Sequence, residues 1–166
     1  MGTKNGHYKS PGKGTITNQE TIAEIASFID EAPESFYRLV IGSDSQVKVV
    51  GKSPQCDYVT AIIIHRVGVG ARYFWKRERT APPPSLRHKI YEETMRSLAV
   101  AESLVPQIQK EIESTNYEFE IHIDVGTVGS TREMIKEVVG MVTGSGFTAK
   151  TKPYSWGASK VADKYT

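Results

Sequence analysis

The sequence has one cysteine, Cys56, so no disulfide bond can form within the chain. A chain without disulfides is typical of a reducing compartment. No stretch approaches the roughly 18 consecutive apolar residues that a membrane-spanning helix needs. The first residues, MGTKNGHYKSPGKG, lack the apolar centre of a secretory signal peptide. We therefore expect a cytoplasmic protein that does not contact a membrane.

Low-complexity tracts and internal repeats are also missing. The chain has 166 residues, of which 39% are hydrophobic and 24% charged. These proportions are ordinary for a globular domain, and the length suffices to bury a core. Residues 1–16 are rich in glycine and lysine, and we expect a flexible basic arm there. Residues 17–166 are then predicted to form a single domain.

The net charge is only +2, but it is unevenly distributed. Residues 66–89 contain seven lysines and arginines and one acidic residue, Glu78. Acidic residues are concentrated between positions 102 and 137. A basic surface that faces a polyanion has this pattern, and so does a chain whose charges are clustered by chance.

Hydrophobic periodicity predicts alternating strands and helices. Thr17 and Glu20 form a capping box that begins a helix to about residue 30. Ser85 caps a long helix that Pro106 should kink or restart, and a second capping box, from Ser130 to Glu133, begins another helix. We expect a short final helix over residues 157–166 and strands over residues 37–41, 58–67, 72–79, 117–124 and 147–152. The order indicates an α/β fold: three antiparallel and two parallel strands in one mixed five-stranded sheet, with helices on both faces.

Two aspartates follow predicted strands. Asp44 comes after the first strand and Asp124 ends the fourth, each before a loop that contains glycine and serine. Ligands bind at the carboxyl ends of strands in open α/β sheets. Two adjacent carboxylates need a cation or a shared proton. The alternative is that each aspartate caps its own loop.

Glu93 is on the inward-facing stripe of the long helix, where a carboxylate needs a partner. Its neighbour Glu92 points sideways and is the better candidate for a solvated residue. The alternative for Glu93 is an ion pair at the rim with Arg87 or Arg96.

Several segments resemble a known family: IGSDSQV, IIIHR, HIDVG…STREMIKEVVGMV, GFTAKTKP and GASKVADKYT. The order of elements resembles the ribonuclease H-like superfamily, and these motifs, from about residue 37 to 166, are similar to the YkuK family of predicted ribonuclease H-related nucleases. The resemblance places the superfamily's four acidic positions on Asp44, Glu93, Asp124 and Asp163. By itself, Asp163 is an ordinary surface residue.

This resemblance implies a metal-dependent nuclease. Two divalent ions can activate water on one side of a phosphodiester and stabilise the leaving oxygen on the other. Oxygen ligands suit Mg²⁺ or Mn²⁺. By analogy Asp44 would bridge both ions, Glu93 and Asp124 would bind one, and Asp163 would bind the other or position the attacking water.

The basic residues predict a nucleic-acid partner, either DNA, RNA or a hybrid. Candidate phosphate-binding residues are Arg72, Lys76, Arg77, Arg79, Lys150, Lys152 and Lys160. Trp156 has two interpretations, stacking on a base or filling the edge of the core. His65 and His122 are better explained as structural residues.

Other functions have weaker support. A nucleic-acid-binding module of the same fold without catalysis is the main alternative. Nucleotide binding is another, because Asp124–Thr127 and Gly129–Thr131 resemble phosphate loops of actin-like ATPases, although no GxxxxGK[ST] loop is present. The absence of a GxSxG motif argues against a serine hydrolase. The sequence leaves open which nucleic acid is the substrate and which oligomer forms.

Overall fold

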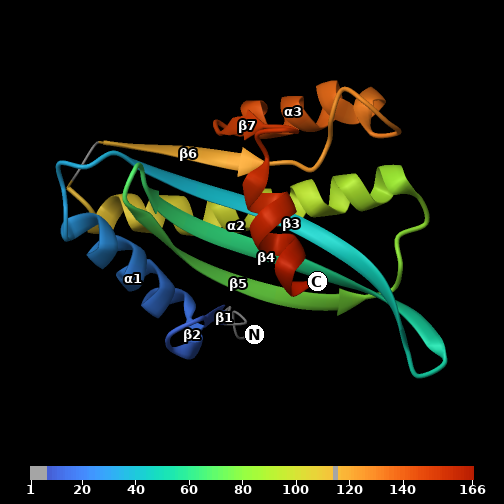
Figure 1. Cartoon of the computed structure of the whole chain (residues 1–166), viewed down its shortest axis with the longest axis horizontal. Helices are drawn as coiled ribbons and strands as arrows, with labels where there is room; N and C mark the ends of the chain where they lie inside the picture. The colour runs from blue at the N-terminus through green and yellow to red at the C-terminus, as the bar shows by residue number, and fades with distance from the viewer. Residues whose placement is uncertain (1–6, 114–115) are drawn as a thin grey trace.

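A computed structural model describes residues 7–113 and 116–166. Its seven strands form one sheet in the order β2-β1-β5-β4-β3-β6-β7 (Figure 1). The strands are β1 (His7–Ser10), β2 (Gly14–Thr17), β3 (Tyr37–Val50), β4 (Ser53–Arg66), β5 (Gly70–Thr80), β6 (Tyr117–His122) and β7 (Thr148–Lys150). The helices are α1 (Asn18–Asp30), α2 (Leu86–Glu111), α3 (Ile135–Gly144) and the short turns η1 (Arg132–Met134), η2 (Gly157–Ala162) and η3 (Asp163–Tyr165).

The prediction of five strands is wrong, because β1 and β2 extend the sheet. They form a hairpin in the segment that we expected to be a flexible arm, and this hairpin meets β5 at Lys9 and Trp75. Tyr8 and Ile16 are each only 3% exposed. These two apolar side chains hold the hairpin, and they are too few to give a strand pattern among lysines and glycines. Residues 1–6 lie outside the described residues.

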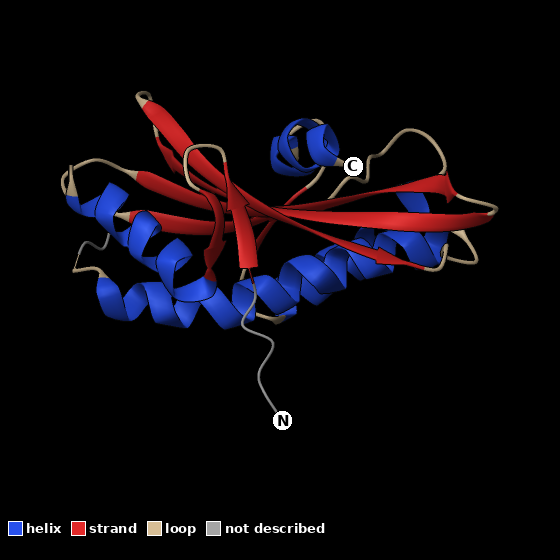
Figure 2. Cartoon of the chain, turned by 90° about the horizontal axis from the view of Figure 1, so that it is seen from below, coloured by secondary structure: helices blue, strands red, loops and turns tan. Residues whose placement is uncertain are grey.

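The mixed topology and the two covered faces are confirmed. β3, β4 and β5 are antiparallel, whereas β6 pairs in parallel with both β3 and β7. Figure 2 shows long helices along one face of the sheet and a short helix near the C-terminus on the other. The larger core lies under α1 and α2 and includes Ile25, Leu39, Ile62, Phe74 and Leu104. A smaller core on the opposite face includes Val40, Ile63 and Ala162, with Trp156 packed against it.

Two of the three helix N-caps predicted from the sequence are present in the structure. Thr17 and Glu20 form the expected capping box, and Ser85 accepts a hydrogen bond from the His88 backbone. The capping box expected from Ser130 to Glu133 is absent, and η1 precedes α3 there. Thr131 instead accepts a hydrogen bond from the Gly126 backbone at 3.2 Å. This bond ties the two ends of the loop together.

The helix that contains Pro106 is continuous from Leu86 to Glu111, so the proline does not divide it. None of the helices in the described part of the chain is long and apolar enough to cross a membrane.

Candidate functional site

The site begins where β3 and β6 stop pairing. Their parallel ladder ends at Gly42 opposite His122. β3 continues to Val50 with β4 as its partner, so Asp44 lies inside a strand and does not follow one as we expected. Asp44 and Asp124 each come two residues after the last parallel pair. The common register therefore brings the two aspartates to the same edge of the sheet.

Alternation along β3 sends neighbouring side chains to opposite faces. Ser43 hydrogen-bonds to Ser97 of α2 at 2.7 Å, and Ser45 donates to Glu93 Oε1 at 2.9 Å. Both serines therefore face α2, and Asp44 between them points to the opposite face. There it shares a side-chain hydrogen bond with Asp163. β3 thus separates Glu93 on one side from Asp163 on the other.

The two adjacent glutamates on α2 have different surroundings. Glu93 is 4% exposed and lies beside Ser45 and Lys89. Glu92 has a side chain that is 39% exposed and forms an ion pair with Arg96, with 3.6 Å between Nε and Oε2. Of the two, Glu93 is the residue that faces the aspartates.

Asp163 reaches the site because residues 157–165, the C-terminal segment, lie directly on β3. A Cβ atom on Gly42 would be 2.7 Å from the Ala158 nitrogen, and one on Gly157 would be 2.6 Å from Val40 Cγ1. The Gly157 N–H also donates to His122 Nδ1 at 2.9 Å. Only glycines permit this close contact between backbone and sheet.

The end of the same segment is held by β5. The Tyr165 ring stacks on Trp75 with centroids 4.2 Å apart, and its hydroxyl hydrogen-bonds to that of Tyr73 at 2.6 Å. Arg77 donates to the Tyr165 carbonyl. Asp163 is exposed, yet its backbone is fixed at both ends of the segment.

The carboxyl groups interact electrostatically. Burial, followed by the hydrogen bond and the negative charge of Asp163, raises the pKa of Asp44 to about 7. Burial raises the pKa of Glu93 to about 8, with Asp44 as the next contributor. Lys89 opposes both shifts. Raised pKa values of neighbouring carboxyls are typical of a site that needs a proton or a cation.

Asp124 adds an incompletely satisfied acceptor. Its Oδ1 atom is buried and makes no hydrogen bond, although Lys152 Nζ lies 3.3 Å away in an ion pair. Within residues 7–113 and 116–166, no three His, Cys, Asp or Glu side chains are arranged to hold a metal ion. The oxygen-only donors and this unsatisfied atom nevertheless fit the chemistry of Mg²⁺ or Mn²⁺.

Comparison with known proteins identifies the family. The chain matches the family model described as Ribonuclease H-like over residues 20–166. The chain belongs to this family. It is similar to the Bacillus subtilis (strain 168) protein named Uncharacterized protein YkuK, with 33% identity over 161 residues that cover 91% of each chain. No solved structure matches the chain significantly.

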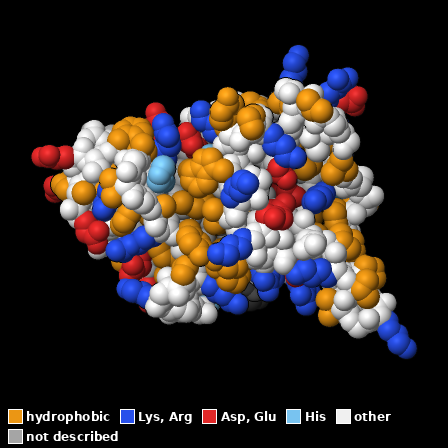
Figure 3. All heavy atoms as spheres, viewed as in Figure 1, with side chains coloured by type: hydrophobic (Ala, Val, Ile, Leu, Met, Phe, Trp, Pro, Cys, Tyr) orange, Lys and Arg blue, Asp and Glu red, His pale blue; other side chains and the backbone are white. Residues whose placement is uncertain are grey.

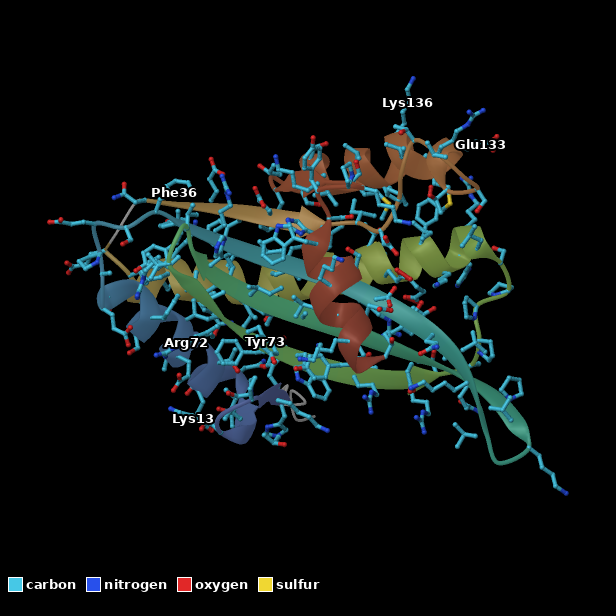
Figure 4. All side chains as sticks on the ribbon, viewed as in Figure 1. Lys13, Phe36, Arg72, Tyr73, Glu133 and Lys136 are labelled. Carbon is cyan, nitrogen blue, oxygen red and sulfur yellow. The ribbon has the colours of Figure 1, made fainter. Side chains whose placement is uncertain are left out.

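The basic residues predicted to bind nucleic acid fall into two groups in this ribonuclease H-like chain. Four have partners within the protein: Arg72 pairs with Glu24 and Glu31, Lys76 with Glu78, Arg77 with the Tyr165 carbonyl and Arg79 with Asp57. In Figure 4, Arg72 lies with Lys13 and Tyr73 beside α1. Lys150, Lys152 and Lys160 belong instead to the elements around the carboxyl groups.

Three small residues that build the site of this ribonuclease H-like chain were not predicted from the sequence. Gly42, Gly157 and Ala158 are small where the C-terminal segment touches β3, but nothing in one sequence links positions so far apart. His122 is buried and fixes the Gly157 backbone, and burial lowers its pKa, which favours the neutral ring. The structural interpretation of His122 is thus in accord with its contacts.

Proposed function

We propose that this chain is a nuclease that hydrolyses phosphodiester bonds in a nucleic acid with the help of divalent metal ions. The main support is a set of electrostatic interactions between carboxyl groups from four separate elements: Asp44 of β3 interacts with Asp163 of the C-terminal segment and with Asp124 after β6, and Glu93 of α2 interacts with Asp44 and Asp124. Carboxyl groups held together in this way cost folding free energy. Membership of the ribonuclease H-like family, whose fold typically uses divalent metals, makes metal binding the best explanation.

Asp44, Glu93, Asp124 and Asp163 would hold the ions. Mg²⁺ or Mn²⁺ bound by these oxygens would activate water and stabilise the leaving oxygen of the phosphodiester. Asp44 is the best candidate for a ligand shared between two ions, because it faces Asp163 on one side of β3 and is coupled to Glu93 on the other. Glu93 and Asp124 would bind one ion, and Asp163 the other ion or the attacking water.

In this proposal, two lysines neutralise the carboxylates until a cation binds. Lys89 Nζ lies 3.9 Å from Glu93 Oε1, and Lys152 pairs with Asp124. Both partly neutralise the carboxylates when no cation is bound. The Lys152 side chain is 51% exposed, so it is free to turn towards a substrate phosphate once a cation has replaced it.

The decisive experiment compares neighbouring variants in cleavage assays. Labelled single-stranded, duplex, hybrid and junction substrates are incubated with Mg²⁺, Mn²⁺ or EDTA. We expect metal-dependent cleavage that Asp44→Asn and Glu93→Gln abolish and that Glu92→Gln retains, because Glu92 forms its ion pair with Arg96. Circular dichroism and thermal melting check that each variant is folded.

Two results would contradict the proposal. Cleavage that persists in purified Asp44→Asn would remove the carboxyl cluster from the reaction. Binding of nucleic acid without cleavage of any substrate would identify a non-catalytic binding module of the same fold.

A further inference from the structure

A second cavity opens beside the C-terminal segment. It has a volume of about 250 Å³ and is lined by Arg38, Glu120, Lys150, Pro153, Tyr154 and Trp156. Pockets for drug-sized ligands measure roughly 300–1,000 Å³. This cavity is smaller than that range, which suits a single planar ring system and not a drug-sized ligand. A larger cavity of about 580 Å³ lies between α1, β5 and the β1–β2 turn, but its two cations, Lys13 and Arg72, both pair with Glu24.

The inner part of the smaller cavity presents fixed polar groups. Because the Gly157 N–H donates to His122 Nδ1, the His122 proton is on Nε2, which lies 3.1 Å from Glu120 Oε2. Glu120 is only 5% exposed, so this hydrogen bond holds a buried carboxylate in place. Arg38 Nε is 3.7 Å from Glu120 Oε1, is buried and makes no hydrogen bond. Arg38 Nε is also 3.8 Å from Glu118 Oε2, and 42% of the Arg38 side chain is exposed, so a buried carboxylate and a partly exposed guanidinium group lie side by side.

The outer part of the cavity presents aromatic rings. Tyr154 is 70% exposed, which is unusual for a ring of its size. Trp156 is half-buried and is held by edge contacts with His122 and His65, at centroid distances of 5.0 and 6.0 Å. Aromatic rings at the mouth of a polar pocket are a common means of stacking unpaired bases.

The cavity is linked to the carboxyl site through neighbouring residues of β6 and β7. Lys150 lines the cavity, and Lys152, two residues further on, pairs with Asp124. The backbones remain paired here, since the Ile123 N–H donates to the Lys150 carbonyl and the Lys152 N–H to that of Val125. Glu120 and Asp124 are four residues apart, about 13 Å along an extended chain. A single nucleic-acid strand can span that distance.

We propose that this cavity binds one unstacked base of a single-stranded nucleic acid whose backbone continues past Lys152 to the four carboxyl groups. Tyr154 and Trp156 stack on the base, while Arg38 and Glu120 hydrogen-bond to its edge. A base inside a duplex is stacked and paired and must be extruded before it can enter such a pocket. The inference rests on the proposed function, which identifies the ligand as a nucleic acid. It adds that the substrate is single-stranded where it enters this cavity.

Binding measured without cleavage tests the proposal. Fluorescence anisotropy with labelled single strands and matching duplexes is recorded in EDTA. We expect Tyr154→Ala to bind single strands about tenfold more weakly, since base stacking on an aromatic ring is worth about that factor or more. Tyr154→Phe, which keeps the ring, and duplex binding by all variants should be unchanged. Equal single-strand affinity for Tyr154→Ala and wild type, or equal losses for single strands and duplexes, would overturn the proposal.

A second measurement uses the two tryptophans. Trp75 and Trp156 are the only ones, so Trp75→Phe leaves Trp156 as the reporter. Single-stranded oligonucleotides should quench its fluorescence, and unchanged fluorescence at saturation would also overturn the proposal. Because neither assay needs cleavage, the outcomes are separable. Quenching without nuclease activity would leave the base pocket intact and remove only the proposed nuclease function.

Discussion

At the scale of single residues, the site is defined by carboxyl groups whose environments disfavour their charge. Asp44 and Glu93 are 7% and 4% exposed, and burial is the largest cause of the raised pKa of each; the charge of Asp44 also raises the pKa of Glu93. By contrast, Asp57 is also buried but accepts two hydrogen bonds from Arg79, which hold its pKa below the usual range. Under the proposed function a metal ion would neutralise Asp44 and Glu93, whereas Asp57 is already paired with the Arg79 guanidinium.

The raised pKa values predict how stability depends on pH. Between about pH 4 and pH 8 the folded chain binds more protons at Asp44 and Glu93 than the unfolded chain, where both pKa values are near 4. The free energy of unfolding in EDTA should therefore fall as the pH rises through this range and level off above it. Denaturant unfolding at a series of pH values measures this slope.

Divalent metal should counteract the loss. Adding Mg²⁺ or Mn²⁺ should raise the melting temperature more at pH 8 than at pH 6, because metal binding favours the deprotonated carboxylates. Asp44→Asn should flatten both the pH dependence and the metal effect. A metal-induced increase of equal size in Asp44→Asn would place the metal elsewhere.

At the scale of secondary structure elements, the C-terminal segment connects the two parts of the site. It begins at the base pocket, where His122 holds Gly157, and it reaches Asp163 beside Asp44. Its contact with β3 depends on backbone-to-sheet packing that a single methyl group would disrupt. The position of Asp163 therefore depends on glycines that have no chemistry of their own.

Two glycine-to-alanine variants test this dependence. Gly157→Ala would place Cβ 2.6 Å from Val40 Cγ1 and 3.0 Å from His122 Nδ1, and we expect a loss of about 1–3 kcal/mol in unfolding free energy together with lower activity. Gly140→Ala, in the exposed interior of α3 with no neighbour within 4 Å, should gain about 0.5–1 kcal/mol and keep full activity. Urea unfolding and cleavage assays give both quantities. Equal effects of the two substitutions would show that the close contact is unimportant.

At the scale of the whole molecule, basic side chains surround an acidic centre. Figure 3 shows Asp and Glu side chains near the middle of this face with Lys and Arg on several sides, and a basic side chain at the tip of the projecting β3–β4 hairpin. Such a surface would attract a polyanion while the acidic centre attracts cations. Many of the basic groups also serve the fold, because Arg72, Arg77 and Arg79 bind protein acceptors.

Salt dependence separates the two groups of basic residues. Lys160→Ala should reduce the slope of log K against log salt for single-strand binding by about one, as expected when one phosphate contact is lost. Arg79→Ala should leave this slope unchanged and lower the melting temperature, because it removes the two hydrogen bonds to buried Asp57. An unchanged slope in Lys160→Ala would exclude Lys160 from phosphate binding.

The sequence alone was sufficient for the α/β class, the mixed sheet, the capping box at Thr17 and the family. These features depend on local patterns: hydrophobic periodicity, helix caps and contiguous motifs. Periodicity also separated Glu93 from Glu92, since adjacent helical residues point about 100° apart. The predicted ends of the strands were less accurate. The polar residues from Ser43 to Gln46 were expected to form a loop, but they continue β3 by pairing with β4.

Only the tertiary structure showed how distant segments meet. The β1–β2 hairpin is held by two buried side chains, the C-terminal segment lies on Gly42 through backbone contacts, and the base pocket combines β3, β6, β7 and a loop. No sequence pattern around Asp163 marks it as a site residue, because what distinguishes it is its interaction with Asp44, 119 positions away in the chain. Local patterns indicate the conformation of one segment. Contacts between segments depend on how side chains pack in three dimensions, and a single sequence does not show which distant residues touch.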